Sequence, residues 1–284
     1  MANIAFLGTG LLGGAFAEAA SKRGDSVTAW NRSMDKVLAL AQFGVKAAPT
    51  PAEAVRGVSR VHIVLKDDAV VEEVIATARV GLSPEAILID HTTTLPALTA
   101  ERAARLHAAG LKYLHCPVFM GPSAARNAQG AMMVAGPRAL FESIEADLAK
   151  MTGRLEYIGE RTDLAAANKL FGNAMIIGLS AVMADVLTLA QACSVDGEDA
   201  IRLLGLLDLN AMMAGRGPNM AKGNFTPNFE LAMARKDVRL MLETAGNRPM
   251  AALPAIAVRM DQLISAGHGA ADASVLGIDA VPRP

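Results

Sequence analysis

Short apolar runs rich in β-branched residues alternate with helical patterns from residue 2 to about residue 160. The pattern predicts strands at 3–7, 26–30, 61–65, 86–90, 111–114, 131–135 and 155–158, and helices at 11–23, 34–43, 69–78 and 96–109. This alternation is typical of βαβ units on a largely parallel sheet. We therefore predict a doubly wound α/β domain in this part of the chain.

The strand signals stop after Gly159, and the sequence from Thr162 onward is almost continuously compatible with helix. Breaks containing Gly or Pro at 215–218, 223–227 and 246–249 divide this part. We place the domain boundary between residues 161 and 162 and expect 162–284 to be all-helical. Its first helix, ending near Cys193, is apolar nearly all round, which indicates burial against another domain or subunit. We therefore expect a homodimer or homotetramer.

Composition narrows the class of partner. The 284 residues carry 27 Lys and Arg against 28 Asp and Glu, for a net charge of −1. The basic patch of a nucleic-acid or anionic-membrane binder is missing, so a small molecule is the expected partner. The uncharged stretch 170–184 is shorter than the ~20 residues that cross a bilayer. With two cysteines and no signal-like N-terminus, the chain is expected in the cytoplasm.

A glycine-rich turn directly follows the first predicted strand and opens the first predicted helix. It reads Gly8-Thr9-Gly10-Leu11-Leu12-Gly13. In a dinucleotide-binding (Rossmann) domain the first glycine permits the tight turn, the second admits the pyrophosphate, and the third allows close helix packing. The helix amino terminus then faces the phosphates. We predict that Gly8, Gly10, Leu11, Leu12 and Gly13 bind a nicotinamide dinucleotide.

The second strand ends in Asn31-Arg32-Ser33, where an NAD-specific fold usually has an acidic residue for the ribose hydroxyls. A guanidinium at this place can meet a 2′-phosphate, and Asn31 and Ser33 can add hydrogen bonds. The residues therefore favour NADP(H), with NAD(H) still possible. An ordinary exposed arginine at a strand end is the alternative for Arg32.

The chain resembles the β-hydroxyacid dehydrogenase family, which includes 3-hydroxyisobutyrate dehydrogenases and glyoxylate/succinic semialdehyde reductases. After the glycine-rich turn, the resemblance is carried in order by 90–96 (DHTTTLP), 116–121 (CPVFMG), 130–136 (GAMMVAG), 168–173 (NKLFGN), 223–227 (GNFTP) with 236–237 (KD), and 267–274. It implies a 6-phosphogluconate dehydrogenase-like fold and interconversion of a hydroxyacid-type alcohol and its aldehyde or ketone.

By this resemblance Lys169 is the catalytic residue. An ammonium there can supply charge and a proton to a developing alkoxide, and neutral lysine can act as base in the reverse direction. Asn173, four residues on, shares its helical face and is the second predicted catalytic residue. A lysine that extends to solvent at a helix start is the alternative from the residues alone.

The resemblance also assigns residues around the cofactor and substrate. Thr92 and Lys236 are expected near the cofactor by this resemblance. Leu65 and Lys66 are expected there because they end the strand predicted at 61–65 and begin the loop after it. Thr93, Phe229 and Asp237 are expected near the substrate. Two alternatives remain open: the threonines cap the next helix, and Lys236-Asp237 is ordinary surface charge.

One block departs from the family pattern D-A-P-V-S-G-G, whose serine and glycines hold a carboxylate. Here Phe119 and Met120 replace the serine and a glycine, and Gly121 follows. We predict that these three residues line a bulkier, less polar substrate pocket. A carbonyl compound larger or less polar than the family norm is our substrate hypothesis.

Two other functions remain in view. An imine reductase resembles this chain overall, although that group commonly carries an acid or tyrosine in place of the lysine. A non-catalytic NADP-binding sensor or assembly protein is made conceivable by Phe119 and Met120. No metal is expected, because His115 and Cys116 point to opposite faces of a strand and no third ligand is near in the sequence.

Overall fold

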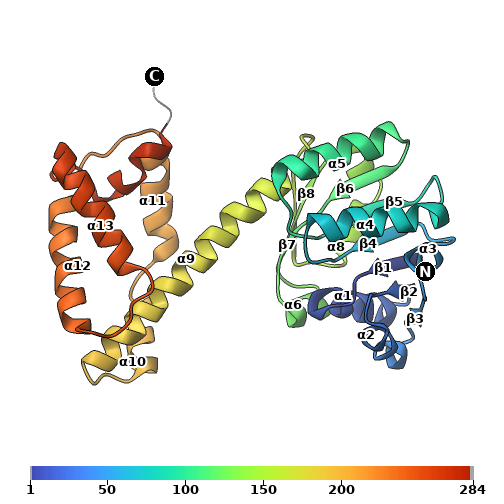
Figure 1. Cartoon of the computed structure of the whole chain (residues 1–284), viewed down its shortest axis with the longest axis horizontal. Helices are drawn as coiled ribbons and strands as arrows, with labels where there is room; N and C mark the ends of the chain where they lie inside the picture. The colour runs from blue at the N-terminus through green and yellow to red at the C-terminus, as the bar shows by residue number, and fades with distance from the viewer. Residues whose placement is uncertain (1, 282–284) are drawn as a thin grey trace. The chain divides into compact units, whose positions relative to one another are not determined.

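The computed structural model describes residues 2–281. The chain divides into two compact units, residues 1–173 and 174–284, which are described separately. The division falls inside the long helix α9 (Leu164–Ala192) (Figure 1). The boundary predicted at 161/162 lies just before this helix and stays a prediction.

The first unit is built on one nine-stranded sheet with the order β3-β2-β1-β4-β5-β6-β8-β7, and β9 pairs with β8 (Figure 1). The strands are β1 (Asn3–Leu7), β2 (Ser26–Trp30), β3 (Lys46–Ala47), β4 (Arg60–Ile63), β5 (Ile87–Asp90), β6 (Lys112–His115), β7 (Val118–Phe119), β8 (Ala131–Ala135) and β9 (Arg154–Gly159). Strands β1 to β6 pair in parallel, whereas β8 runs antiparallel to β6 and β7. The first six strands follow the 3-2-1-4-5-6 order of a Rossmann sheet, which confirms the predicted fold class.

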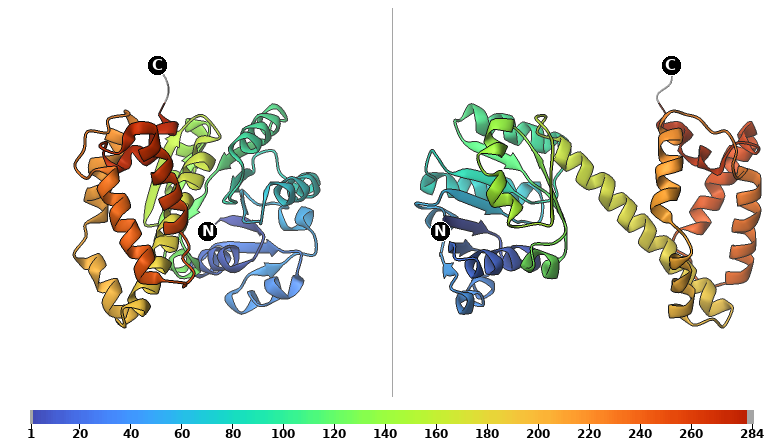
Figure 2. Two further views of the ribbon diagram at one scale, coloured as in Figure 1. Left: turned by 60° about the vertical axis from the view of Figure 1, so that its left-hand side comes forward. Right: turned by 180° about the vertical axis from the view of Figure 1, so that it is seen from behind.

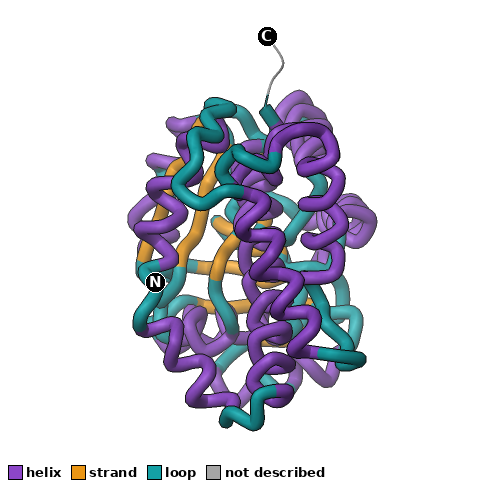
Figure 3. The backbone as a smooth tube through the Cα atoms, turned by 90° about the vertical axis from the view of Figure 1, so that its left-hand side faces the viewer, coloured by secondary structure: helices purple, strands orange, loops and turns teal. Residues whose placement is uncertain are grey.

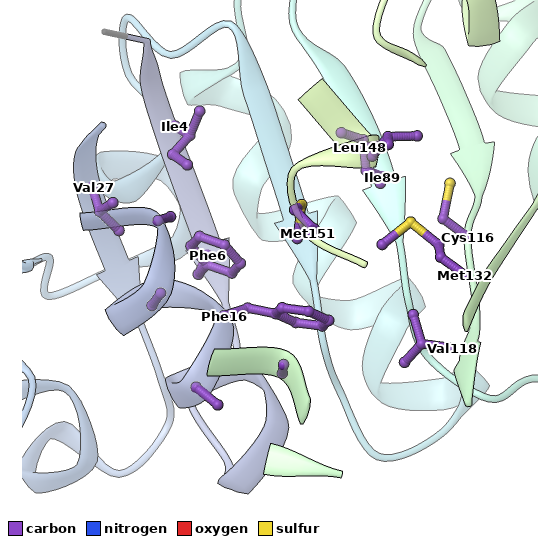
Figure 4. Close-up of a cluster of buried hydrophobic side chains, with 14 of the residues drawn as sticks. Ile4, Phe6, Phe16, Val27, Ile89, Cys116, Val118, Met132, Leu148 and Met151 are labelled. Carbon is purple, nitrogen blue, oxygen red and sulfur yellow. The ribbon is translucent and has the colours of Figure 1, made fainter. Parts of the chain in front are cut away.

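Helices cover both faces of this sheet, and Figure 3 marks the helices and strands of the chain by colour. They are α1 (Leu11–Lys22), α2 (Met34–Leu38), α3 (Pro51–Ala54), α4 (Asp68–Ala78), α5 (Pro96–Ala108), α6 (Pro122–Arg126), α7 (Arg138–Glu142) and α8 (Glu145–Ala149). On β1, Phe6 packs with Phe16 of α1 on one face, and Leu7 packs with residues of α3, α4 and α5 on the other (Figure 4). Because successive side chains alternate between two buried faces, the strand is apolar throughout.

The strand register brings five loops to one edge of the sheet. Leu7 is opposite both Trp30 and Ile63, Ile63 is opposite Asp90, and Asp90 is opposite His115. The carboxyl ends of β1, β2, β4, β5 and β6 therefore lie in one row. In open α/β sheets ligands bind outside such a row.

The described part of the second unit contains helices and no strand (Figure 2). After α9 follow α10 (Gly197–Ile201), α11 (Leu209–Ala221), α12 (Leu231–Ala245) and α13 (Leu253–Leu263), a π-helical turn at Ile264–His268 and a 3-10 segment at Ala273–Ala280. The buried faces of α12 and α13 share a core that includes Leu231, Val238 and Met260. The Asp185 carboxylate of α9 accepts hydrogen bonds from the amides of Ala251, Ala252 and Leu253, where α13 begins. The expected all-helical second part is confirmed.

One expected helix break is wrong. Helix α11 runs through 215–218, with Pro218 in its interior. A proline removes a single backbone donor, and the turn after it still forms because the Lys222 amide donates to the Pro218 carbonyl at 3.2 Å. The breaks at 223–227 and 246–249 do separate α11 from α12 and α12 from α13.

Helix α9 is also long and apolar enough to cross a membrane by length and composition, the only such helix in 2–281. Its most apolar window has a mean hydropathy of 1.8, and 6% of that window is buried within the chain. The uncharged stretch 170–184 is shorter than this helix, because α9 extends beyond Lys169 at one end and beyond Asp185 at the other. Core helices of soluble proteins pass the same test, so this is weak evidence, and the absence of a membrane partner stays a prediction.

Candidate functional site: a dinucleotide groove and a half-buried lysine

The turn after β1 has the geometry that a bound pyrophosphate requires. Gly8 has φ +100°, and a Cβ there would lie 2.1 Å from the Val64 carbonyl oxygen. A Cβ on Gly13 would lie 2.1 Å from the Gly8 carbonyl oxygen, so glycine lets α1 pack against the turn. A Cβ on Gly10 would meet nothing within 4 Å and would project into open space beside the backbone. The geometry of Gly8 and Gly13 agrees with the roles expected of them, and the approach of a pyrophosphate to Gly10 stays a prediction.

The turn is tied to the end of β2 through one side chain. The Thr9 amide donates to Asn31 Oδ1 at 3.2 Å, and Asn31 Nδ2 donates to the Ser33 carbonyl at 3.1 Å. Asn31 therefore fixes both loops, while the Arg32 side chain is left exposed. Its guanidinium is available to an anionic group on the ligand.

A cavity of about 520 Å³ lies along this edge of the sheet, wholly within the first unit. Eleven predicted site residues line it: Gly10, Leu11, Leu12, Gly13, Asn31, Arg32, Ser33, Leu65, Lys66, Thr92 and Thr93. Gly8 shapes the turn without lining the cavity. Sequence reasoning missed seven lining residues: Trp30, Lys36, Val64, Val70, Glu73, Val74 and His91. Of these, Lys36 could have been predicted from the sequence, because it is a second cation four residues after Arg32.

Thr92 is held by its neighbours. Its hydroxyl accepts a hydrogen bond from the Leu65 amide at 3.1 Å, and its own amide donates to Asp90 Oδ1 at 2.9 Å. Asp90 is fully buried and also accepts from the Tyr113 hydroxyl at 2.9 Å. The loops after β4 and β5 are thereby joined at the cavity. The hydrogen bonds of Thr92 thus hold together the loops after β4 and β5. Its side chain does not cap α5, the helix that follows.

Behind this wall two buried histidines form a hydrogen-bonded pair. His91 Nδ1 lies 2.7 Å from the Cys116 carbonyl, so it carries the proton, and His91 Nε2 accepts from His62 Nδ1 at 3.0 Å. Burial lowers the pKa of His91 to about 4 and holds that of His62 well below its usual range. Both rings are therefore neutral at pH 7 and add no charge to the cavity.

Lys169 lies in the first turns of α9, and its side chain is half-buried. Its Nζ donates to the Val118 carbonyl of β7 at 2.7 Å and lies 4.1 Å from the centre of the Phe119 ring. Burial lowers the pKa of Lys169. Within residues 2–281 no carboxylate pairs with this ammonium within 4.0 Å, and its partial burial distinguishes it from an exposed surface lysine. Asn173 follows one turn later on the same helix.

The block that departs from the family pattern, residues 119–121, begins beside this lysine. Phe119 and Met120 are both half-buried, and Phe119 packs against Met133, Ala135 and Ala165. Gly121 ends the block and precedes the first residue of α6. Phe119 therefore lies on β7, the strand that holds the Lys169 ammonium, and Met120 and Gly121 follow directly after that strand.

The remaining predicted residues belong to the second unit. Lys236 and Asp237 lie on α12 and form an ion pair of 2.9 Å, and Phe229, partly exposed, precedes that helix. Their assignments to cofactor and substrate stay predictions. Among residues 2–281 no group of three His, Cys, Asp or Glu side chains could hold a metal ion.

Comparison with known proteins places this geometry in a family. Residues 3–159 match the NAD-binding domain of 6-phosphogluconate dehydrogenase, and residues 164–276 match the NAD-binding model of NADP-dependent 3-hydroxyisobutyrate dehydrogenase. The chain belongs to the β-hydroxyacid dehydrogenase family. The predicted resemblance, the NAD(P) cofactor and the assignment as an oxidoreductase are confirmed.

Individual relatives of this dehydrogenase-family member are distant. Glyoxylate/succinic semialdehyde reductase 1 of Arabidopsis thaliana is 28% identical over 88% of this chain and 89% of that protein. Cytokine-like nuclear factor N-PAC of Homo sapiens is 28% identical over 84% of this chain and 44% of that protein. An imine reductase from Myxococcus stipitatus in complex with NADP+ has the same fold, with a TM-score of 0.86 at 22% identity, covering 96% and 98% of the two chains.

Replacing Gly13 by alanine tests the phosphate-binding turn. The methyl group would clash with the Gly8 carbonyl, so we expect a loss of about 1–3 kcal/mol in the free energy of unfolding. We also expect the Kd for NADPH to rise at least about tenfold, because the turn must move. Urea unfolding and NADPH fluorescence titration measure the two effects.

The neighbouring Gly14→Ala is the matched control. A Cβ there meets nothing closer than 3.6 Å, and alanine is favoured over glycine inside a helix. This variant should bind NADPH normally and keep or gain stability. Equal effects of the two substitutions would contradict the role given to Gly13.

Proposed function

We propose that this NAD(P)-dependent oxidoreductase interconverts a hydroxyacid-type alcohol and its aldehyde or ketone with NADP(H), and that Lys169 is its general acid and base. The observation that carries the proposal is a half-buried ammonium with a burial-lowered pKa and no carboxylate partner in 2–281, bonded to the strand that bears the substrate block. A proton on such a group is held weakly enough to be transferred.

The chain's own residues define a simple sequence of events. NADPH, when bound, supplies the hydride. As the carbonyl carbon is reduced, negative charge develops on its oxygen, and the Lys169 ammonium stabilises that charge and donates one proton to it, which leaves a neutral amine and an alcohol. One Nζ hydrogen stays on the Val118 carbonyl, so the nitrogen keeps its place while another hydrogen is given up. Oxidation reverses these proton steps.

The walls beside Lys169 favour a less polar substrate than the family norm. Phe119 and Met120 present apolar surface where the family pattern has a hydroxyl and a glycine. Carboxylate binding through the backbone amides of Gly121 and Ser123 is compatible with this, because neither amide lies inside the strand pairing. A larger or less polar aldehyde or ketone is the proposed substrate class.

Preference for NADP(H) is proposed from the charge at the end of β2. Arg32, Ser33 and Lys36 line the cavity at one end, and two of them are cations. Glu73 lines the same cavity, on α4 rather than at the β2 end where an acidic residue would contact the ribose hydroxyls.

Two other functions have an observation behind them. The similar imine reductase structures support imine reduction, which the apolar Phe119 and Met120 would also suit. The similarity to N-PAC, which is named a cytokine-like nuclear factor, is the observation behind the non-catalytic alternative. Lys169 favours the carbonyl reduction over both.

A homodimer or homotetramer is proposed from the surface of α9. Met175, Ile176, Ile177 and Leu179 are each more than half exposed in the single chain. Contiguous apolar surface of this kind marks an interface.

Lys169→Ala separates the three functions when NADPH consumption is followed with aldehydes, ketones and imines. We expect carbonyl reduction to fall by about 10²–10⁴-fold while the Kd for NADPH is unchanged. In the wild type, kcat/KM for reduction should decline as pH rises through the lowered Lys169 pKa, because only the ammonium donates a proton. Oxidation should rise over the same range.

Other outcomes of this experiment would decide against the proposal. Glyoxylate as the clear best substrate would overturn the apolar substrate class. Imines reduced in preference to all carbonyls would favour the imine reductase. NADPH binding without turnover of any compound would favour the non-catalytic role.

Arg32→Ala tests the cofactor preference. Loss of one charge-assisted contact should raise the Kd for NADPH by about 10- to 100-fold and leave that for NADH nearly unchanged. Arg56→Ala is the control, since Arg56 is exposed and does not line the cavity. A parallel loss for both nucleotides would show that Arg32 does not contact a 2′-phosphate.

Sedimentation velocity of the full chain tests the assembly. We expect a dimer or tetramer, and we expect Ile177→Glu to shift it towards monomer, because a buried charge without a partner is costly. Val80→Glu changes an even more exposed apolar residue of the first unit and should leave the assembly intact. A monomeric wild type would refute the proposed oligomer.

A further inference from the structure

The Lys169 ammonium is held by two consecutive residues of β7. It donates to the Val118 carbonyl at 2.7 Å and lies 4.1 Å from the centre of the Phe119 ring. A cation at this distance from a ring face is attracted by the negative face of the π system. The ring therefore stabilises the charged form of the lysine, whereas burial stabilises the neutral form.

Gly172 provides the space for that ring. A Cβ at position 172 would lie 2.2 Å from Phe119 Cζ and 2.7 Å from Cε1, which no relaxed structure allows. Glycine in a helix interior is unfavourable relative to alanine. The second glycine of α9, Gly178, has nothing within 4 Å of such a Cβ, whereas at Gly172 the ring of Phe119 takes the place of a side chain.

The other side of the ring is fixed as well. Phe119 packs with Met133, Ala135, Ala165 and their neighbours in a small apolar cluster on β8 and the start of α9. The ring is thus held between this cluster and Gly172, and its face is presented to Lys169. Asn168, the neighbour of Lys169 on α9, is uncharged and turns its amide to the Leu164 carbonyl. Within 2–281 no charged side chain pairs with the ammonium.

We propose that Phe119 is a positioning residue for Lys169: its ring, admitted by the missing side chain at Gly172, holds the protonated amine against β7 by a cation–π contact. Phe119 then serves both as apolar wall and as the group that keeps the ammonium in place without a counter-ion. The contact itself does not depend on the reaction. Its value for proton transfer rests on the proposed function.

Competitive acetylation of the full chain with acetic anhydride over a range of pH measures this contact without turnover. Peptide mass spectrometry gives the labelling of Lys169 relative to exposed Lys222. In Phe119→Leu the apolar volume is largely kept and the ring face is lost, so the midpoint of Lys169 labelling should move to lower pH. Labelling at a fixed pH below the midpoint should rise about two- to fivefold, the range of a partly exposed cation–π contact.

Greater solvent exposure of Lys169 in Phe119→Leu would give a different result from loss of the cation–π contact, so the two effects can be told apart. Relief of burial would move the midpoint to higher pH or raise only the plateau at high pH. Either of these outcomes in Phe119→Leu, or no change, overturns the proposal. Met120→Leu, at the next residue of the same block, should leave the midpoint in place, and an equal shift there would also overturn it.

Gly172→Ala provides the second arm. The new methyl group must displace the ring, so this variant should shift the midpoint as Phe119→Leu does, and adding it to Phe119→Leu should cause no further shift. Independent, additive shifts would show that Gly172 does not act through Phe119. If Lys169→Ala retained turnover while these shifts were seen, the proposed function would fail and the positioning contact would stand.

Discussion

Removal of water from one ammonium group is the constraint on which the site depends. Lys169 loses part of its hydration on α9, and in 2–281 no carboxylate within 4.0 Å compensates for that loss. The compensation comes instead from a backbone carbonyl and an aromatic face, which attract a cation less strongly than a carboxylate would. The proton is therefore kept in place and still easily released, which a tight ion pair would prevent. The phenylalanine at position 119 is part of this balance.

Much of the fold could be predicted because its signals are local. Strands β1, β2 and β8 were predicted at their observed bounds, since each is an apolar run between turn residues. The two-residue strands β3 and β7 were missed, because pairing with a neighbour, and no local pattern, defines them. The expected break at 215–218 failed for a similar reason. A single Pro218 costs one hydrogen bond, and the surrounding turns of α11 are enough to continue the helix.

The candidate site shows the same limit. Glycines at Gly8, Gly10 and Gly13 act through backbone geometry that the motif itself encodes, so the phosphate turn was predictable. His91 was missed because its place at the cavity wall depends on a bond to the carbonyl of Cys116 from another strand. The bulk of Phe119 could be predicted from the departing block. Its contact with Lys169 could not, since a cation–π pair between β7 and α9 exists only once the two elements have packed.

The pairing of Phe119 with Gly172 restricts how this protein can change over evolution. A side chain at position 172 must displace the ring, because the two would occupy one volume. A lineage that first shrinks residue 119 and only afterwards adds a side chain at position 172 avoids this displacement, whereas the reverse order passes through an intermediate in which the ring has lost its place beside Lys169. Descendants of this sequence should therefore show the two positions changing in that order, although they lie on different elements of the fold.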